Sequence, residues 1–139
     1  MVTLLIGKKG TGKTKKLISL ANEAVAASTG NVVVIEKGSK LTYDVTHKAR
    51  LIDTEQYLIS GYDMLFGFIS GICAGNYDVT DILVDSTFKI CPELLQALKP
   101  LQRSFRILPK LHQLTLFSLF LLTKAKFRSQ SMLFAEKYN

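Results

Sequence analysis

The sequence predicts an α/β fold, a three-layer sandwich in which helices cover both faces of a mainly parallel sheet. Short apolar runs rich in Val, Ile and Leu occur at 2–6 and within 31–36 and 81–85, and they are typical of buried strands. Between them, apolar residues recur at three- and four-residue spacing over 13–28 and 61–75, which indicates helices. Strands that alternate with helices form parallel sheets, and we expect the second and third strands to lie near the first.

The first part of the chain has the pattern of a strand, a turn, a helix and a second strand. Val2–Ile6 is short, apolar and β-branched, and Gly7 ends it. From Lys13 onward the apolar positions fall on one helical face, until Gly30 stops the helix. Asn31 then leads into a continuous apolar run, which suits a strand buried on both faces.

The sequence of residues 51–85 predicts a short strand, a helix, a turn and a further strand. Leu and Ile at 51–52 indicate the short strand, and the mostly apolar stretch 61–75 indicates the helix. Residues 76–78 are typical of a turn. The apolar run that follows is another buried strand, and it ends in the carboxylate of Asp85.

Composition narrows the class of protein. With 139 residues, of which 47% are apolar, the chain is expected to form one domain with its own core, which excludes a disordered tail. Two cysteines, Cys73 and Cys91, exclude a disulfide scaffold and fit buried thiols in a reducing compartment. The N-terminal residues lack the order of a secretory signal, and the apolar run at 114–122 is too short to span a bilayer. We therefore expect a cytoplasmic protein with no membrane partner, and the sequence leaves its oligomeric state open.

One segment carries a chemical motif, since it fits G-x-x-x-x-G-K-[ST] in full with a strand before it and a helix after it. Its residues are Gly7, Lys8, Lys9, Gly10, Thr11, Gly12, Lys13 and Thr14. Glycines let the backbone wrap around a polyphosphate with its N–H groups pointing inward, and the helix adds its positive N-terminal end. We expect Lys13 to reach the β- and γ-phosphates of a nucleoside triphosphate and Thr14 to offer its hydroxyl to Mg²⁺.

Carboxylates at strand ends would complete this site. Asp85 follows an apolar strand, where a carboxylate would hold the hydration shell of Mg²⁺. Glu36 ends the second strand, so we expect it to act beside Lys13 as a catalytic group that orients or deprotonates the nucleophile. The alternative is that Glu36 is an ordinary solvent-exposed residue. Asp53 is a weaker candidate of the same kind. Arg50 and Lys37 are candidates for phosphate contacts, and the alternative is that both are ordinary surface residues.

With these residues the chain resembles the P-loop NTPase superfamily over residues 1–91. It is similar to a group of small bacterial ATP-binding proteins in which a basic loop precedes stretches like Asn31–Ser39 and Asp81–Thr87. Thymidine-kinase-like proteins share this order of motifs, but there a catalytic Glu typically follows the aspartate, where this chain has Ser86. The resemblance implies ATP and Mg²⁺ as ligands, with slow hydrolysis or switching. An N/TKxD-like guanine element is missing from the sequence, which favours ATP over GTP.

Two other functions stay open. The first is a phosphotransferase, or kinase, that acts on a nucleoside or another small acceptor. The second is a basic module that binds nucleic acid, because residues 92–139 carry +6 of the net charge of +7. Phenylalanines lie between the basic residues of this part, and such aromatic rings can stack on bases.

The composition of residues 92–139 departs from the rest of the chain. This part has no Gly, Val or Asp, and leucine supplies 12 of its 48 residues. We expect a short helix near 92–101, while the run 114–122 fits a strand or a helix equally well. A P-loop fold normally continues with a Val/Ile-rich strand, so we hypothesise that part of 92–135 is translated out of frame. A neighbouring reading frame of 114–132 can encode such a strand, and the nucleotide sequence of the gene tests this. If that frame encodes no Val-rich strand, the hypothesis fails; if it does, the basic patch is not a binding surface.

Overall fold

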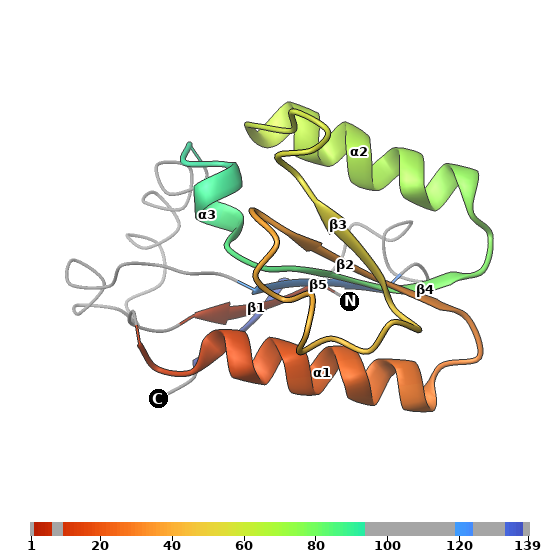
Figure 1. Ribbon diagram of the computed structural model, residues 1–139. Helices are drawn as coiled ribbons and strands as arrows, with labels where there is room; N and C mark the ends of the chain where they lie inside the picture. The colour runs from red at the N-terminus through yellow and green to blue at the C-terminus, as the bar shows by residue number, and fades with distance from the viewer. Residues whose placement is uncertain (1, 7–9, 94–118, 124–132, 138–139) are drawn as a thin grey trace.

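The computed structural model describes residues 2–6, 10–93, 119–123 and 133–137, and their elements alternate between strand and helix (Figure 1). The elements are β1 (Val2–Ile6), α1 (Lys13–Ala27), β2 (Asn31–Glu36), β3 (Arg50–Asp53), α2 (Tyr62–Gly75), β4 (Val79–Val84), α3 (Thr87–Ile90), β5 (Leu119–Thr123) and β6 (Leu133–Lys137). The α/β class predicted from the sequence is therefore confirmed.

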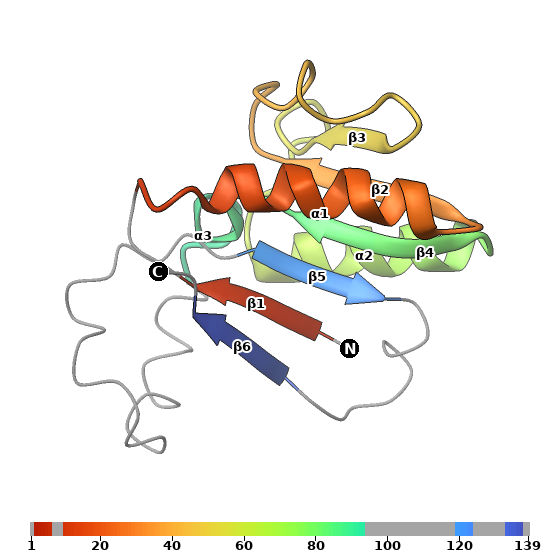
Figure 2. The same ribbon diagram turned by 90° about the horizontal axis from the view of Figure 1, so that it is seen from below.

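The strands form one sheet of six in the order β3-β2-β4-β5-β1-β6 (Figure 2). β2 pairs in parallel with both β3 and β4, and β1 pairs in parallel with β6. β5 lies antiparallel between β4 and β1. The expected parallel arrangement thus holds for β3, β2 and β4, whereas β5 interrupts it.

The two long helices lie on opposite sides of this sheet (Figure 1). Side chains alternate along β2, so that Val32 and Val34 pack on the side of α1, while Val33 and Ile35 pack on the side of α2. The core on the α1 side includes Leu17 and Ala21 of the helix, together with residues from the loop between β2 and β3. Since both faces of β2 are covered, its sequence is a continuous apolar run, as predicted.

The element bounds agree closely with those predicted from the sequence over residues 2–91. β4 begins at Val79, two residues earlier than expected, and Asp85 follows its last residue. β2 and β4 were expected near β1 and lie in the same sheet, but β5 stands between β4 and β1, and the strands paired with β1 are β5 and β6. Of the run at 114–122, the described part belongs to β5, and the helix expected near 92–101 lies almost wholly outside the described residues.

A close backbone contact joins the turn after α1 to the strand β4. Gly30 lies so near the start of this strand that an added Cβ would come within 2.2 Å of the carbonyl oxygen of Asp78, the residue before β4, and within 2.5 Å of the Thr80 Cγ2. The next residue is held by the same segment, because the Asn31 N–H donates to the Asp78 carbonyl at 2.7 Å. Only glycine fits at position 30 without movement of the backbone.

Within the described ranges, no helix is long and apolar enough to cross a membrane.

Candidate functional site

The glycine-rich loop begins the candidate site, and the structure describes it from Gly10 onward. Gly10 and Gly12 have φ angles of 86° and 83°, which are left-handed conformations that other residues rarely adopt. Gly12 is also the N-cap of α1, and no side chain caps this end of the helix. Gly7, Lys8 and Lys9, which were predicted to take part in phosphate binding, lie outside the described residues.

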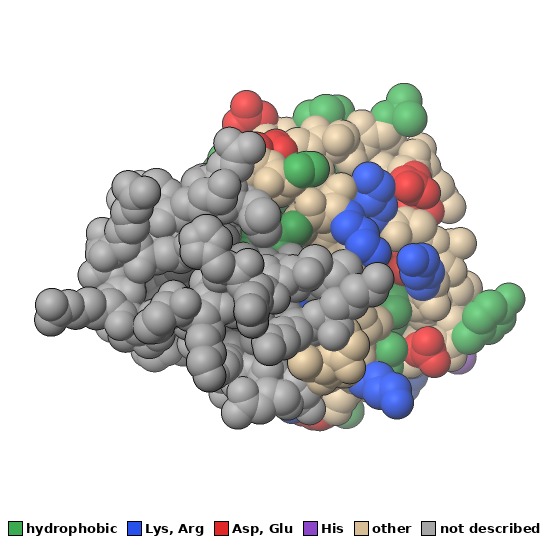
Figure 3. All heavy atoms as spheres, turned by 90° about the vertical axis from the view of Figure 1, so that its left-hand side faces the viewer, with side chains coloured by type: hydrophobic (Ala, Val, Ile, Leu, Met, Phe, Trp, Pro, Cys, Tyr) green, Lys and Arg blue, Asp and Glu red, His purple; other side chains and the backbone are tan. Residues whose placement is uncertain are grey.

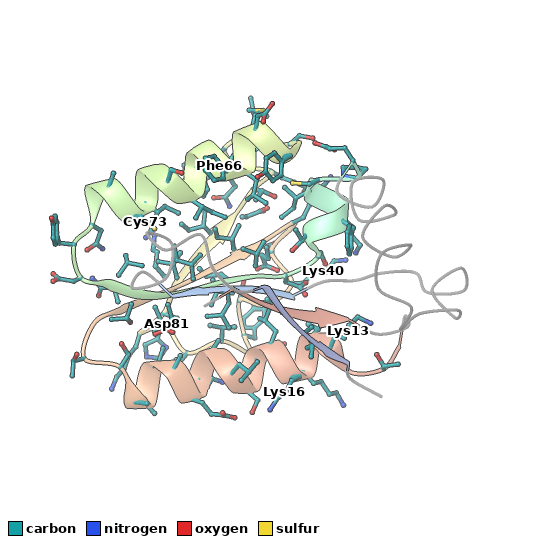
Figure 4. All side chains as sticks on the ribbon, turned by 180° about the vertical axis from the view of Figure 1, so that it is seen from behind. Lys13, Lys16, Lys40, Phe66, Cys73 and Asp81 are labelled. Atoms are coloured by element: carbon teal, nitrogen blue, oxygen red, sulfur yellow. The ribbon has the colours of Figure 1, made fainter. Side chains whose placement is uncertain are left out.

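Lys13 is the first residue of α1, and its side chain is buried between this helix and the sheet (Figure 4). Its exposed fraction is 8%, and its Nζ donates a hydrogen bond to the Thr11 Oγ1 at 3.3 Å. Burial lowers the pKa of Lys13 below its ordinary value, and the negative charge of Asp85 opposes this change. The negative charge of Asp85 therefore acts on Lys13, whereas the neighbouring Thr14 is exposed.

Asp85 is held by a sharp turn at the end of β4. Its N–H donates to the Ile35 carbonyl at 2.8 Å, and one carboxylate oxygen, Oδ2, accepts a hydrogen bond from the Ser86 hydroxyl at 2.8 Å. Ser86 is itself nearly buried and has a φ of 55°, in the left-handed region. Non-glycine residues adopt this conformation at a cost of about 1–3 kcal/mol, and such residues cluster at functional sites.

Glu36 is buried, with an exposed fraction of 1%, so the alternative of a solvent-exposed residue is wrong. Its carboxylate accepts hydrogen bonds from the N–H groups of Lys40 and Leu41 at 3.0–3.2 Å. Burial raises the pKa of Glu36; the two backbone hydrogen bonds lower it, and the charges of Asp53 and Asp85 raise it further. The carboxylate of Glu36 thus holds the turn after β2 through these hydrogen bonds, and the negative charges of Asp53 and Asp85 act on it.

Three strand-end carboxylates, Glu36, Asp53 and Asp85, lie at one edge of the sheet. Glu36 pairs in register with Asp53, and Asp85 comes one residue after Val84, the partner of Ile35. Alternation along the strands places all three on the side of α1, which is also the side of Lys13. Figure 3 looks onto this edge, where basic side chains lie beside acidic ones.

These carboxylates do not converge on one point. Asp53 instead accepts the N–H groups of Gly38 and Glu55 through its Oδ1, at 2.8 and 2.9 Å. In the part of the chain that the structure describes, no group of three His, Cys, Asp or Glu residues could hold a metal ion by itself. Any metal at this edge would therefore need further ligands, such as Thr14, water or phosphate oxygens.

Two features of the site were not predicted from the sequence. One is the left-handed turn at Ser86, for which the sequence has no signal, because serine seldom takes this conformation. The other is the turn over residues 37–41 that buries Glu36, for which Gly38, with a φ of 83°, was an available signal. Arg50, a candidate for a phosphate contact with an ordinary surface residue as the alternative, is not brought to the glycine-rich loop. It begins β3 and therefore lies at the opposite end of that strand from Asp53.

Comparison with other proteins adds no assignment, because no protein-family model, no curated protein and no solved structure matches this chain.

A pH dependence follows from the burial of Glu36. Since the folded protein holds a proton on this carboxyl to a higher pH than the ordinary value of 4.5, the unfolded chain releases the proton first. The contribution of Glu36 to the free energy of unfolding therefore falls as the pH rises from that value through the raised one. Urea unfolding from about pH 4 to about pH 8 measures this, with Glu36→Gln as the reference that cannot titrate. We expect the wild type to lose stability relative to Glu36→Gln across this interval, and a relative gain would contradict the assignment.

Proposed function

We propose that this chain binds ATP with Mg²⁺ at the edge formed by the glycine-rich loop and the strand-end carboxylates. The observation that carries the proposal is the placement of Lys13. A lysine is buried in the first turn of a helix, directly after two left-handed glycines, and it interacts with the carboxylate that follows β4. Burying an ammonium group is costly, so a lysine buried at this position favours a role toward a bound anion.

The residues present fit a nucleotide and its metal ion. The N–H groups from Lys9 to Thr14 would surround the phosphates, and Lys13 would contact the β- and γ-phosphates. Asp85 has its Oδ2 fixed by Ser86, while no hydrogen bond to its Oδ1 occurs among the described residues. This oxygen and the exposed hydroxyl of Thr14 would hold Mg²⁺, which would neutralise charge on the phosphates. The proposal includes the P-loop type of three-layer fold and a cytoplasmic setting.

The burial and the hydrogen bonds of Glu36 favour slow turnover of the nucleotide. Its raised pKa suits a group that accepts a proton from the attacking nucleophile. However, both of its oxygens accept backbone hydrogen bonds, and the side chain is 1% exposed. The turn at 37–41 must open before a water molecule reaches this carboxylate, so we propose slow hydrolysis or a nucleotide-dependent switch.

Isothermal titration calorimetry with ATP, with and without Mg²⁺, tests the proposal. We expect a micromolar to submillimolar Kd with Mg²⁺ and weaker binding when EDTA removes it. Folded protein that releases no heat with millimolar ATP or GTP would overturn the assignment. A phosphotransferase remains the second candidate, and labelled ATP separates the two, because inorganic phosphate appears without an acceptor only in the case of hydrolysis.

The third candidate function, nucleic-acid binding, is supported only by the positive charge of residues 92–139. Most of these residues lie outside the described part of the chain. Such a function would show as binding that neither ATP nor the substitution Lys13→Ala affects.

The Ser86 hydroxyl is expected to tune the affinity for the metal ion. Ser86→Ala keeps the strained backbone and removes the donor to Asp85 Oδ2, so the carboxylate gains freedom to rotate. Loss of such a supporting hydrogen bond typically weakens metal binding about tenfold. In the calorimetric titration, we expect Ser86→Ala to lower the Mg²⁺-dependent gain in ATP affinity by this factor and to leave Mg²⁺-free binding unchanged. Ser39→Ala, an exposed serine, is the control, and an equal effect of both substitutions would contradict this role.

A further inference from the structure

A hollow lies at the opposite end of the sheet from the candidate site. It has a volume of about 440 Å³, within the range of small-molecule sites. Its walls are the first half of β2, the edge strand β3 and the C-terminal half of α2, together with Lys48 from the preceding loop. This cavity is independent of the proposed function, because it shares no residue with the phosphate loop or the strand-end carboxylates.

The apolar part of the wall comes from the sheet and from α2. Val33, Ile52 and Ile72 belong to the core on the α2 side, and each also lines the cavity. On the helix, Gly71 and Gly75 line it as well, and a Cβ built on either would meet nothing within 4 Å. The cavity is therefore open where a side chain on α2 would otherwise fill it.

The polar part of the wall is positively charged. Lys48 and Arg50 line the cavity, and no acidic residue does. Among the described residues, neither cation makes an ion pair or a side-chain hydrogen bond. Arg50 is exposed, begins β3 and lies on the same strand face as Ile52, and both residues line the cavity. Asn31 adds an amide at the same end of the sheet.

We propose that this cavity binds a small organic carboxylate with an apolar body. Arg50 would pair with the carboxylate through two parallel N–H···O bonds, which the planar guanidinium favours. Lys48 would add a second positive charge, while the body would pack against Ile52 and Ile72 and over Gly71. An anion without an apolar body would leave these walls in water, so the shape favours a carboxylic acid over inorganic phosphate.

Titration with benzoate, followed by amide chemical shifts in NMR spectra of the full chain, tests this proposal. We expect shifts at the first residues of β2 and β3 with a submillimolar to millimolar Kd, and much weaker effects from benzyl alcohol and phosphate. Arg50→Gln removes the charge and Gly71→Leu fills the cavity, and each should weaken benzoate binding at least tenfold. Two matched controls, Lys40→Gln and Gly67→Leu, change an exposed lysine and an open helical glycine outside the cavity, and they should leave it unchanged.

Three results would overturn the proposal. The first is an unchanged Kd in Arg50→Gln or in Gly71→Leu. The second is binding of benzyl alcohol as tight as that of benzoate, which would mean that the charge has no role. The third is displacement of benzoate by phosphate at equal concentration, which would mean that the apolar walls have no role in binding. Thermal unfolding of each variant separates loss of binding from loss of the fold.

Discussion

Lys13→Ala is expected to lower the affinity for ATP with Mg²⁺ about 100-fold, which corresponds to about 2.7 kcal/mol. The physical reason is the loss of a desolvated positive charge from the place where the phosphates would lie. Asp85 would then lose the cation that balances its charge, and it would repel the nucleotide instead. Calorimetric titration with ATP measures the change.

The same substitution should not harm the fold. Burial lowers the pKa of Lys13, so the folded state pays a desolvation cost for this ammonium group that alanine avoids. We expect the free energy of unfolding of Lys13→Ala to equal or exceed that of the wild type. The matched control is Lys15→Ala, which removes an exposed lysine from the same helix turn and should change ATP affinity little. Equal effects of Lys13→Ala and Lys15→Ala would show that Lys13 has no specific role.

Gly30→Ala is expected to lower the free energy of unfolding by about 3 kcal/mol. The added Cβ would lie 2.2 Å from the Asp78 carbonyl oxygen, and this oxygen belongs to the backbone, which cannot rotate away as a side chain can. Relief requires the turn between α1 and β2 to move away from β4, which weakens the hydrogen bond from Asn31 to Asp78. Urea unfolding measures the loss.

Another glycine supplies the control for this experiment. Gly67 lies inside α2, and a Cβ there would meet nothing within 4 Å. Alanine is the better helix former, so Gly67→Ala should raise the free energy of unfolding by about 0.5–1 kcal/mol. If Gly30→Ala is as stable as the wild type, the close contact between the turn and β4 is wrong.

The local elements of residues 2–91 could be predicted because their signals are local. Continuous apolar runs predicted β2 and β4, and the three-to-four spacing of apolar residues from Leu17 to Val25 predicted α1. The glycine-rich loop was found because its function would require positive φ angles, which glycine alone adopts freely, and Gly10 and Gly12 do have them.

Other features depend on contacts that no local pattern encodes. The burial of Glu36 arises from a turn that folds back over its carboxylate, whereas a strand-end glutamate is ordinarily exposed. The conformation of Ser86 is imposed by the turn around Asp85 rather than by its own preference. The position of β5 could not be predicted either, since a leucine-rich run without alternation fixes neither its partners nor its register.

The placement of β5 has a consequence for how the molecule is made. β1 leads into the glycine-rich loop, yet among the described strands it pairs only with β5 and β6, which are encoded more than a hundred residues later. During synthesis, the first strand to leave the ribosome therefore has neither of these partners until residues 119–123 follow it. The glycine-rich loop is translated early, but the strand that leads into it is paired late, so a chain truncated after β4 would lack both of the described strand partners of β1.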